Sequence, residues 1–317
     1  MVPEDHEGVS QSLSAGCIPG DVVSQVTKTH GTGAAGRGSC IGKETARDLA
    51  QRGARVILAC RNVQKADEAR ADIVESTGNK QVIVQHLDLS SLKSVRNFVK
   101  QVEENEKRLD ILINNAVDVN LRNKLTEDGI QAEAQTNHFG PFLLTILLLG
   151  LMKNSAPSRI VVVSSLMHKK ARLDADKFHI TRDRRPLTNY CNAKLANLLF
   201  VNELARRLEG SGVAVNGLHP GTVRTEIYKT LTGIIAVAVN LLAALFFKTA
   251  TEGAQTSIHL AVSEEVEGIS GAYFEDCKLA RSSSKSQDKE LAKKLWDMSV
   301  KCVKLTEKEM AILNGVK

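Results

Sequence analysis

The chain has 317 residues, a length that suits one large domain or two small ones. Apolar residues make up 43% and charged residues 25%, which is ordinary for a globular protein and excludes a disordered, collagen-like or coiled-coil chain. The net charge of +6 is dispersed along the chain and aromatic residues reach only 4%, so we expect no nucleic-acid partner. An anionic cofactor or an acidic membrane surface fits this charge equally well.

The six cysteines are scattered, at positions 17, 40, 60, 191, 277 and 302. None has CxxC spacing and no His/Cys cluster has zinc spacing, so we expect no metal site. Scattered cysteines in a chain of this size favour a reducing intracellular compartment. The first sixteen residues contain no apolar core, which argues against a secretion signal or a membrane anchor at this end.

Residues 1–30 are polar and aperiodic, which predicts a poorly ordered leader. From residue 43 onwards, helix-forming and strand-forming segments alternate. Strands are predicted at 54–59, 81–87, 109–113, 159–163 and 213–218, and helices at 43–52, 63–76, 92–105, 132–153, 187–209 and 289–304. This alternation indicates βαβ units and a parallel sheet, the α/β class, in which ligands bind beyond the carboxyl ends of the strands.

Polar residues follow one of these strands in a pattern that suits proton transfer. Ser164 and Ser165 come directly after the strand at 159–163, and Tyr190 and Lys194 follow on the next predicted helix. Their i, i+4 spacing places them on one helix face, where the cation lowers the pKa of the phenol. Alone, a YxxxK spacing is common, and a surface tyrosine beside a solvated lysine is the alternative.

The surrounding motifs favour the catalytic interpretation. In order and spacing, IGKETARDLAQRGARVILACRN, LDILINNA, LTEDG, TNHFGPFLLT, RIVVVSSL, YCNAKLAN, HPGTVRTE and EGAQTSIHLA resemble the short-chain dehydrogenase/reductase family and its retinol dehydrogenase branch. The resemblance covers roughly residues 36–305. It implies a single Rossmann-type, doubly wound domain that transfers a hydride between NAD(P) and the CH–OH group of an alcohol, or the corresponding carbonyl.

The resemblance also assigns roles to individual residues. Tyr190 is the implied acid/base, Lys194 holds the nicotinamide ribose, Ser165 binds the substrate oxygen, and Asn137 supports a water relay to Lys194. The implied cofactor-binding residues are Tyr190 and Lys194 together with Gly36, Gly38, Ile41, Gly42, Arg61, Asp88, Leu89, Asn115, Ala116, Pro220, Gly221, Val223 and Thr225.

The strand at 54–59 is followed by Cys60, Arg61 and Asn62, with no acidic residue to bind the 2′-hydroxyl of NAD. An arginine there accommodates the 2′-phosphate of NADP. The sequence therefore favours NADP(H) over NAD(H), although Arg61 could also be an exposed loop residue.

The glycine-rich loop at 29–42 departs from the family pattern TGxxxGxG. When Ile41 and Gly42 are aligned, Gly36 takes the first glycine position and Cys40 the middle one, where a Cβ would crowd the pyrophosphate. Gly33 or Gly38 would serve only in a remodelled loop. The residues before Gly36 are polar, and the apolar candidates for a first strand, Val22, Val23 and Val26, lie too far upstream for the family spacing.

Two further positions depart from the family, because Val117 stands in place of a glycine and Pro141 in place of a common histidine. These departures leave open a rival hypothesis, a catalytically weak or inactive member with a binding or scaffold role. We expect a dehydrogenase domain at 31–305 with an apolar lid near 233–247, and a tail at 306–317. The lid is too short to span a membrane, and it suits a small lipophilic substrate and peripheral membrane contact; a buried helix is the alternative. We expect a location in the cytoplasm or peripherally on the endoplasmic reticulum membrane.

Overall fold

The computed structural model of the chain describes residues 21–25, 40–119, 124–181, 187–222 and 248–314. Its centre is an eight-stranded sheet in the order β3-β2-β1-β4-β5-β6-β7-β8, parallel except for the last pair. The strands are β1 (Asp21–Gln25), β2 (Arg55–Cys60), β3 (Val82–His86), β4 (Ile111–Asn114), β5 (Ser158–Val163), β6 (Val213–His219), β7 (Tyr273–Glu275) and β8 (Lys278–Leu279). This order confirms the single-domain, doubly wound α/β fold.

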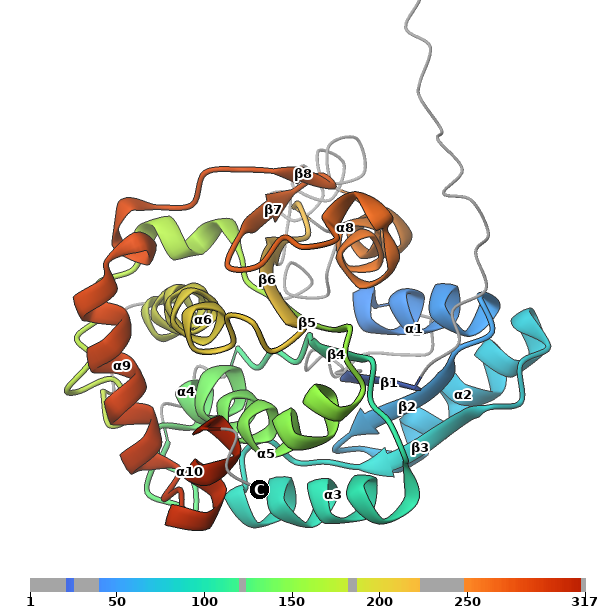
Figure 1. Cartoon of the computed structure of the whole chain (residues 1–317), viewed down its shortest axis with the longest axis horizontal. Coiled ribbons are helices and arrows are strands. Elements are labelled where there is room, and N and C mark those ends of the chain that lie inside the picture. Colours follow the sequence, from blue (N-terminus) through green and yellow to red (C-terminus); the bar gives the residue numbers. More distant parts are fainter. Residues whose placement is uncertain (1–20, 26–39, 120–123, 182–186, 223–247, 315–317) are drawn as a thin grey trace, which may run out of the picture.

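Helices cover both faces of the sheet (Figure 1). The α-helices are α1 (Ile41–Gln51), α2 (Val63–Thr77), α3 (Leu92–Asn105), α4 (Ala132–Ala134), α5 (Gly140–Asn154), α6 (Thr188–Arg207), α8 (Ala250–Val262), α9 (Lys289–Cys302) and α10 (Glu307–Asn314). Short 3-10 or π turns are labelled η: η1 (Gln135–Phe139), η2 (Leu166–Lys170), η4 (Glu264–Val266) and η5 (Ser284–Gln287). None of the helices in the described ranges is long and apolar enough to cross a membrane.

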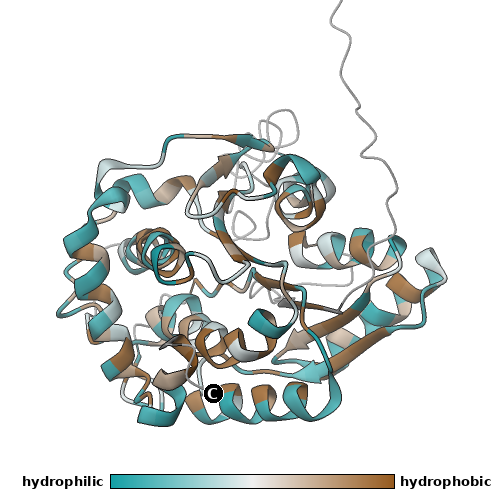
Figure 2. Cartoon of the chain, viewed as in Figure 1, coloured by the Kyte–Doolittle hydropathy of each residue, from teal (hydrophilic) through white to brown (hydrophobic). Residues whose placement is uncertain are grey.

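The core is divided in two by the sheet, because successive side chains of a strand point to opposite faces. Val22, Leu58 and Ile113 pack with α1, α2 and α8 on one face. Val23 and Ile57 lie on the other face, with α3, α5 and α6. Apolar residues are concentrated on the strands and the inner helix faces, whereas polar residues cover the outside (Figure 2).

The first strand corrects an expectation from the sequence. Val22 and Val23 are completely buried in β1, which pairs with β2 on one side and β4 on the other. Their distance from Gly36 does not prevent this, because a longer connection between strand and helix costs little free energy. The domain therefore includes residues 21–25, and the expected leader boundary at residue 30 is wrong.

The C-terminal boundary also differs from the expected tail at 306–317. Helix α10 packs against α5, and the Arg96 guanidinium on α3 pairs with the Glu309 carboxylate at 2.9 Å. The Lys153 ammonium donates to the carbonyl of Ile312 at 2.9 Å, at the end of α10 where a cation is favourable. The domain therefore continues beyond residue 305 through α10.

The helix predicted at 132–153 is interrupted by η1, a π turn over Gln135–Phe139. Pro141 follows this turn at the start of α5. Proline has no N–H and clashes with the carbonyl four residues earlier, so an unbroken α-helix cannot pass through this position. The interruption places Asn137 on the π turn.

Candidate active site

The carboxyl ends of the parallel strands meet at one edge of the sheet (Figure 1). The predicted site residues follow these ends in succession, since Arg61 comes after β2, Asp88 after β3 and Asn115 after β4. Ser165 follows β5 and Pro220 follows β6. The topology therefore brings together residues that are far apart in the sequence.

Lys194 is the buried cation of the site. Its side chain is 2% exposed, and its ammonium donates to the carbonyl of Val163 at 2.9 Å. Burial lowers the pKa of Lys194 to about 8. The ammonium also lies 5.7 Å from the centre of the Tyr190 ring, which confirms the shared helix face expected for these residues. A cation at this distance favours the phenolate form of the tyrosine.

The two serines after β5 have different environments. Ser164 is buried, and its hydroxyl donates to the carbonyl of Lys194 at 2.7 Å. Ser165 is half-buried at the start of η2, where its hydroxyl accepts from the amide of Met167 at 3.3 Å. The hydroxyl of Ser165 is the acceptor in this bond, so its own hydrogen is not used there. The expected contact with a substrate oxygen stays a prediction.

Asn137 is engaged with the loop that follows β4. Its side-chain oxygen accepts from the amide of Asp118 at 2.7 Å, and its side-chain nitrogen donates to the carbonyl of Asp118 at 2.7 Å. This pair of bonds fixes the loop against η1. The expected water relay from Asn137 to Lys194 stays a prediction.

The residues expected near the pyrophosphate and adenine lie at the starts of α1 and α3. Ile41 and Gly42 open α1, with Cys40 as its N-cap residue in an extended conformation, whereas Gly36 and Gly38 lie outside the described residues. The Asp88 carboxylate accepts from the amide of Ser90 at 2.9 Å.

The backbone of Leu89 lies close to the backbone of α5 at Gly140. A Cβ built on Gly140 would lie 2.4 Å from the carbonyl oxygen of Leu89, so only glycine fits there. Nearby, Ala116 is buried and Asn115 half-buried after β4. These contacts fix the backbone in the region where the adenosine is expected.

The remaining cofactor residues follow β2 and β6. Arg61 is exposed directly after β2. Gly221 has a φ of +85°, and a Cβ there would lie 2.6 Å from the Lys248 side chain. Pro220 precedes it in the half-buried loop after β6. Val223, Thr225 and the proposed lid at 233–247 lie outside the described residues.

The chemistry of Lys194 fits a dinucleotide. Burial without a counter-ion is unfavourable for an ammonium, and Lys194 forms no ion pair with any residue in the described ranges. One of its three protons is used by Val163, which leaves donors for the hydroxyls of a ribose. The side chain is thus suited to the nicotinamide ribose that the sequence assigns to it.

Sequence reasoning missed several residues that hold this site together. Asn192, inside the YCNAK motif, accepts from the amide of Arg172 at 2.8 Å and so ties α6 to the segment after η2. The imidazoles of His168 and His219 contact the turn that carries Ser165. Asn192 could have been found because it lies between Tyr190 and Lys194, but the histidines carry no local signal.

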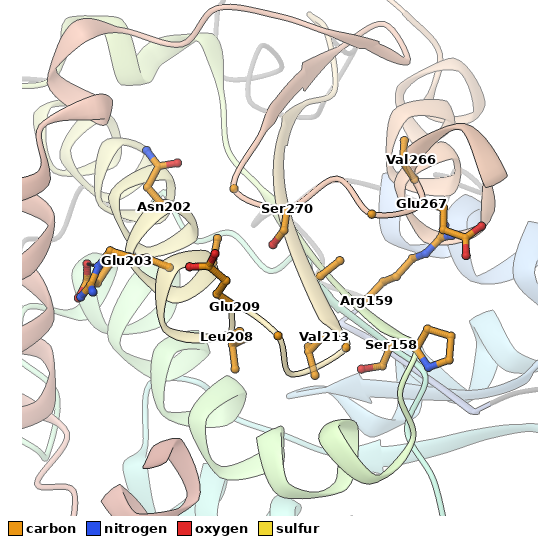
Figure 3. Close-up of a pocket in the computed structure, with 18 of the residues that line it drawn as sticks. Ser158, Arg159, Asn202, Glu203, Leu208, Glu209, Val213, Val266, Glu267 and Ser270 are labelled. Atoms are coloured by element: carbon orange, nitrogen blue, oxygen red, sulfur yellow. Dashed lines mark hydrogen bonds and ion pairs between the residues drawn. The ribbon is translucent and has the colours of Figure 1, made fainter. Parts of the chain in front are cut away.

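A hollow of about 1100 Å³ opens at the opposite edge of the sheet (Figure 3). It is lined by the first residues of β5 and β6, including Ser158, Arg159 and Val213, and by Glu203 and Glu209 near the end of α6. The Glu203 carboxylate is already paired with Arg206 at 2.7 Å. The hollow is separate from the Tyr190 and Lys194 pair, since it lies at the amino ends of the strands.

Comparisons with known proteins agree with this arrangement. Residues 32–233 match the model of the short chain dehydrogenase family. The chain is 46% identical to human (Homo sapiens) retinol dehydrogenase 14, with 83% of each protein covered, and 47% identical to mouse (Mus musculus) retinol dehydrogenase 11 over the same shares. Among solved structures, an uncharacterised protein from Mycobacterium paratuberculosis has a TM-score of 0.70 at 30% identity, covering 91% of this chain and 95% of that one.

A family model that spans most of the chain and relatives of this similarity agree with the geometry at the strand ends. The chain therefore belongs to the short-chain dehydrogenase family, within its retinol dehydrogenase branch, and is an NAD(P)-dependent oxidoreductase acting on CH–OH groups.

Proposed function

We propose that this chain is an NADP-dependent oxidoreductase that interconverts a lipophilic alcohol, retinol or a similar compound, with its aldehyde or ketone. The observation that carries the proposal is the buried ammonium of Lys194 beside the ring of Tyr190, on a helix bonded to the turn that bears Ser165. The substrate class is supported by the retinol dehydrogenases that the chain resembles.

Lys194 would hold the ribose of a bound nicotinamide cofactor, whose ring would supply or accept the hydride. In the direction of reduction, the Tyr190 hydroxyl gives its proton to the carbonyl oxygen as negative charge develops there, and in oxidation the phenolate removes the alcohol proton. Lys194 favours the phenolate through its charge. The Ser165 hydroxyl donates to the same substrate oxygen and stabilises its developing charge.

The preference for NADP rests on Arg61. It directly follows β2, the strand end at which this fold binds the 2′ position of the adenosine ribose. Its exposed guanidinium is free to approach a phosphate, since no described residue forms an ion pair with it. A charge-assisted contact of this kind favours NADP over NAD.

We propose an intracellular, reducing location, in the cytoplasm or peripherally on the endoplasmic reticulum membrane. The five described cysteines support the reducing compartment because none of them forms a disulfide bond. A lipophilic substrate partitions into membranes, which supports a peripheral position.

The rival function is a weak or inactive member that binds a partner without turnover. Cys40 favours this rival, because its Cβ stands at the N-terminus of α1, where the pyrophosphate needs room. The intact arrangement of Ser165, Tyr190 and Lys194 favours the enzyme.

The deciding experiment measures NADPH affinity by fluorescence titration and the reduction of all-trans-retinal by loss of NADPH absorbance. We expect binding and turnover by the wild type. Tyr190→Phe should reduce kcat at least about a thousandfold, within the range for loss of a general acid–base group, while NADPH affinity and circular dichroism stay unchanged. If Tyr190→Phe keeps activity within tenfold of the wild type, Tyr190 is not the proton donor. A wild type that binds no NADPH supports the rival.

A further inference from the structure

His168 is a buried imidazole to which the proposed chemistry gives no role. It lies in η2, on the turn that begins at Ser165, and its side chain is 1% exposed. Its ring and the Tyr273 ring of β7 form a T-shaped pair, with the centroids 5.4 Å apart. Burial lowers the pKa of His168 below its ordinary value. The charged groups that act on the imidazole are Lys169 and Glu275.

Its two nitrogens have different partners, which sets the position of the ring proton. The Nδ1 atom lies 2.7 Å from the carbonyl oxygen of Ser165, an acceptor only, so Nδ1 carries the hydrogen. The amide of Ser283 donates to Nε2 at 3.0 Å, so Nε2 has none. Both bonds require the neutral imidazole in one tautomer.

The second partner comes from a distant part of the chain. Ser283 is 115 positions away from His168 and lies just before η5, which leads into α9. The Lys285 ammonium also donates to the carbonyl of Ala171 at 3.1 Å, so two bonds join this segment to the end of η2. Helix α9 in turn packs along α6, the helix that carries Tyr190 and Lys194 (Figure 1).

A second histidine supports the turn from β6. The amide of Leu166 donates to Nδ1 of His219 at 3.3 Å. The Ser165 carbonyl and the Leu166 amide belong to the same peptide unit, so this peptide is bonded to an imidazole at both its oxygen and its nitrogen. The Ser165 carbonyl also accepts from the backbone amide of His168 at 3.0 Å, so the imidazole bond adds to a main-chain bond. Together these bonds restrain the main chain of Ser165, and a shift of its Cα would move the Ser165 hydroxyl with it.

We propose that His168 is a positioning residue for the reaction, which holds the Ser165 peptide through Nδ1 so that the Ser165 hydroxyl points at the substrate oxygen. The inference rests on the proposed function, because it assigns that hydroxyl to the substrate. The bond from His168 to Ser165 therefore affects the turnover number, whereas the bond from Ser283 to His168 affects only the stability of the fold.

Two substitutions separate these bonds. In His168→Asn the side-chain nitrogen replaces Nδ1 and keeps the donor to Ser165, and in His168→Gln the longer side chain reaches the place of Nε2 and keeps the acceptor for Ser283. Lys285→Met is the matched control, since it removes the other link between the same segments without touching the Ser165 peptide.

Steady-state turnover of retinal with NADPH is measured for all four proteins, together with NADPH affinity and thermal unfolding. We expect His168→Gln to lower kcat about tenfold, the effect of losing roughly one hydrogen bond at the reacting group, with unchanged NADPH affinity. His168→Asn and Lys285→Met should keep kcat within about twofold, even where they lower Tm. Equal kcat values for the Asn and Gln variants, or losses that follow Tm alone, overturn the proposal.

Hydrogen exchange of the peptide spanning residues 164–168 gives a readout that does not require turnover. The amides of Leu166 and Met167 are hydrogen-bonded within the described structure, so they report the order of the turn. Faster exchange in His168→Gln but not in His168→Asn supports the part of the proposal in which Nδ1 orders the Ser165 turn, and this result stands even if the wild type proves inactive and the proposed function fails. The same exchange in both variants overturns it.

Discussion

The Ser164 hydroxyl donates to the backbone carbonyl of Lys194 at 2.7 Å. The Lys194 ammonium, in turn, donates to the carbonyl of Val163, the last residue of β5. Strand β5 and helix α6 are therefore bonded in both directions at the position where the tyrosine and lysine must be held. Ser164 therefore holds the helix in place, whereas the substrate contact that we propose is assigned to Ser165.

Replacing Arg61 with aspartate should move cofactor preference from NADPH towards NADH. The change removes a cation that can contact the 2′-phosphate and adds a repelling carboxylate. A charge-assisted contact contributes about 1.5–3 kcal/mol, so NADPH affinity should fall about ten- to a hundredfold. Fluorescence titration with both nucleotides measures the ratio.

Arg70→Asp is the control, because it makes the same charge change on the exposed surface of α2, where Arg70 pairs with Asp67. It should leave the ratio of the two affinities unaltered. An unchanged ratio in Arg61→Asp would show that Arg61 does not contact the phosphate.

Replacing Cys40 with glycine should tighten NADPH binding. Cys40 is the N-cap of α1, where backbone amides attract an anion, and its Cβ occupies room at that position. We expect a gain of about tenfold in affinity, or about 1.4 kcal/mol. Cys40→Ser keeps the Cβ and should bring no gain. Equal affinity in all three proteins would mean that the pyrophosphate contacts a different part of the loop.

Replacing Gly140 with alanine should destabilise the domain. The new Cβ would meet the carbonyl oxygen of Leu89 at 2.4 Å, and neither backbone can move without shifting a helix or the segment after β3. Overpacking of this kind costs about 1–3 kcal/mol of unfolding free energy. NADPH affinity should fall as well, since Leu89 is expected to lie near the adenine.

Gly150→Ala is the matched control on the same helix. A Cβ there would lie 3.8 Å from the Ile312 side chain, an ordinary contact. Because alanine favours the helix over glycine by up to about 1 kcal/mol, this variant should be neutral or more stable. Urea unfolding of both variants tests the contrast, which disappears if Gly140 tolerates a side chain.

The buried His138 should make stability depend on pH below neutrality. Its ring nitrogens contact Asn197 at 3.4 Å and Ser299 at 3.0 Å, and burial lowers its pKa to about 4. Between the unfolded pKa near 6.5 and this value, the unfolded chain binds a proton that the native protein does not. Stability from the neutral His138 is therefore complete above pH 6.5 and falls as the pH drops towards 4.

The test compares the unfolding free energy at pH 7 and pH 5 for the wild type and His138→Gln. The loss on acidification should be smaller in the variant by about 2 kcal/mol, the linkage expected for this pKa difference. His168, His219 and His259 also have lowered pKa values, so part of the pH dependence should remain. An identical loss in both proteins would show that His138 does not titrate in this way.

Local patterns in the sequence were enough for most of the fold. The helix predicted at 92–105 matches α3 because an amphipathic run follows Ser91, whose hydroxyl caps the helix by accepting from the amide of Ser94. The i, i+4 spacing of Tyr190 and Lys194 likewise depends only on helix geometry.

Tertiary structure decided what local patterns could not show. Strand β1 has only two apolar residues with described side chains. It is buried because it pairs with β2 on one side and β4 on the other, inside the sheet. Pairing with non-local neighbours overrides weak local propensity. The bonds from His168 to Ser165 and Ser283 depend on the same effect, because residues 115 positions apart meet only once the sheet and α9 have packed.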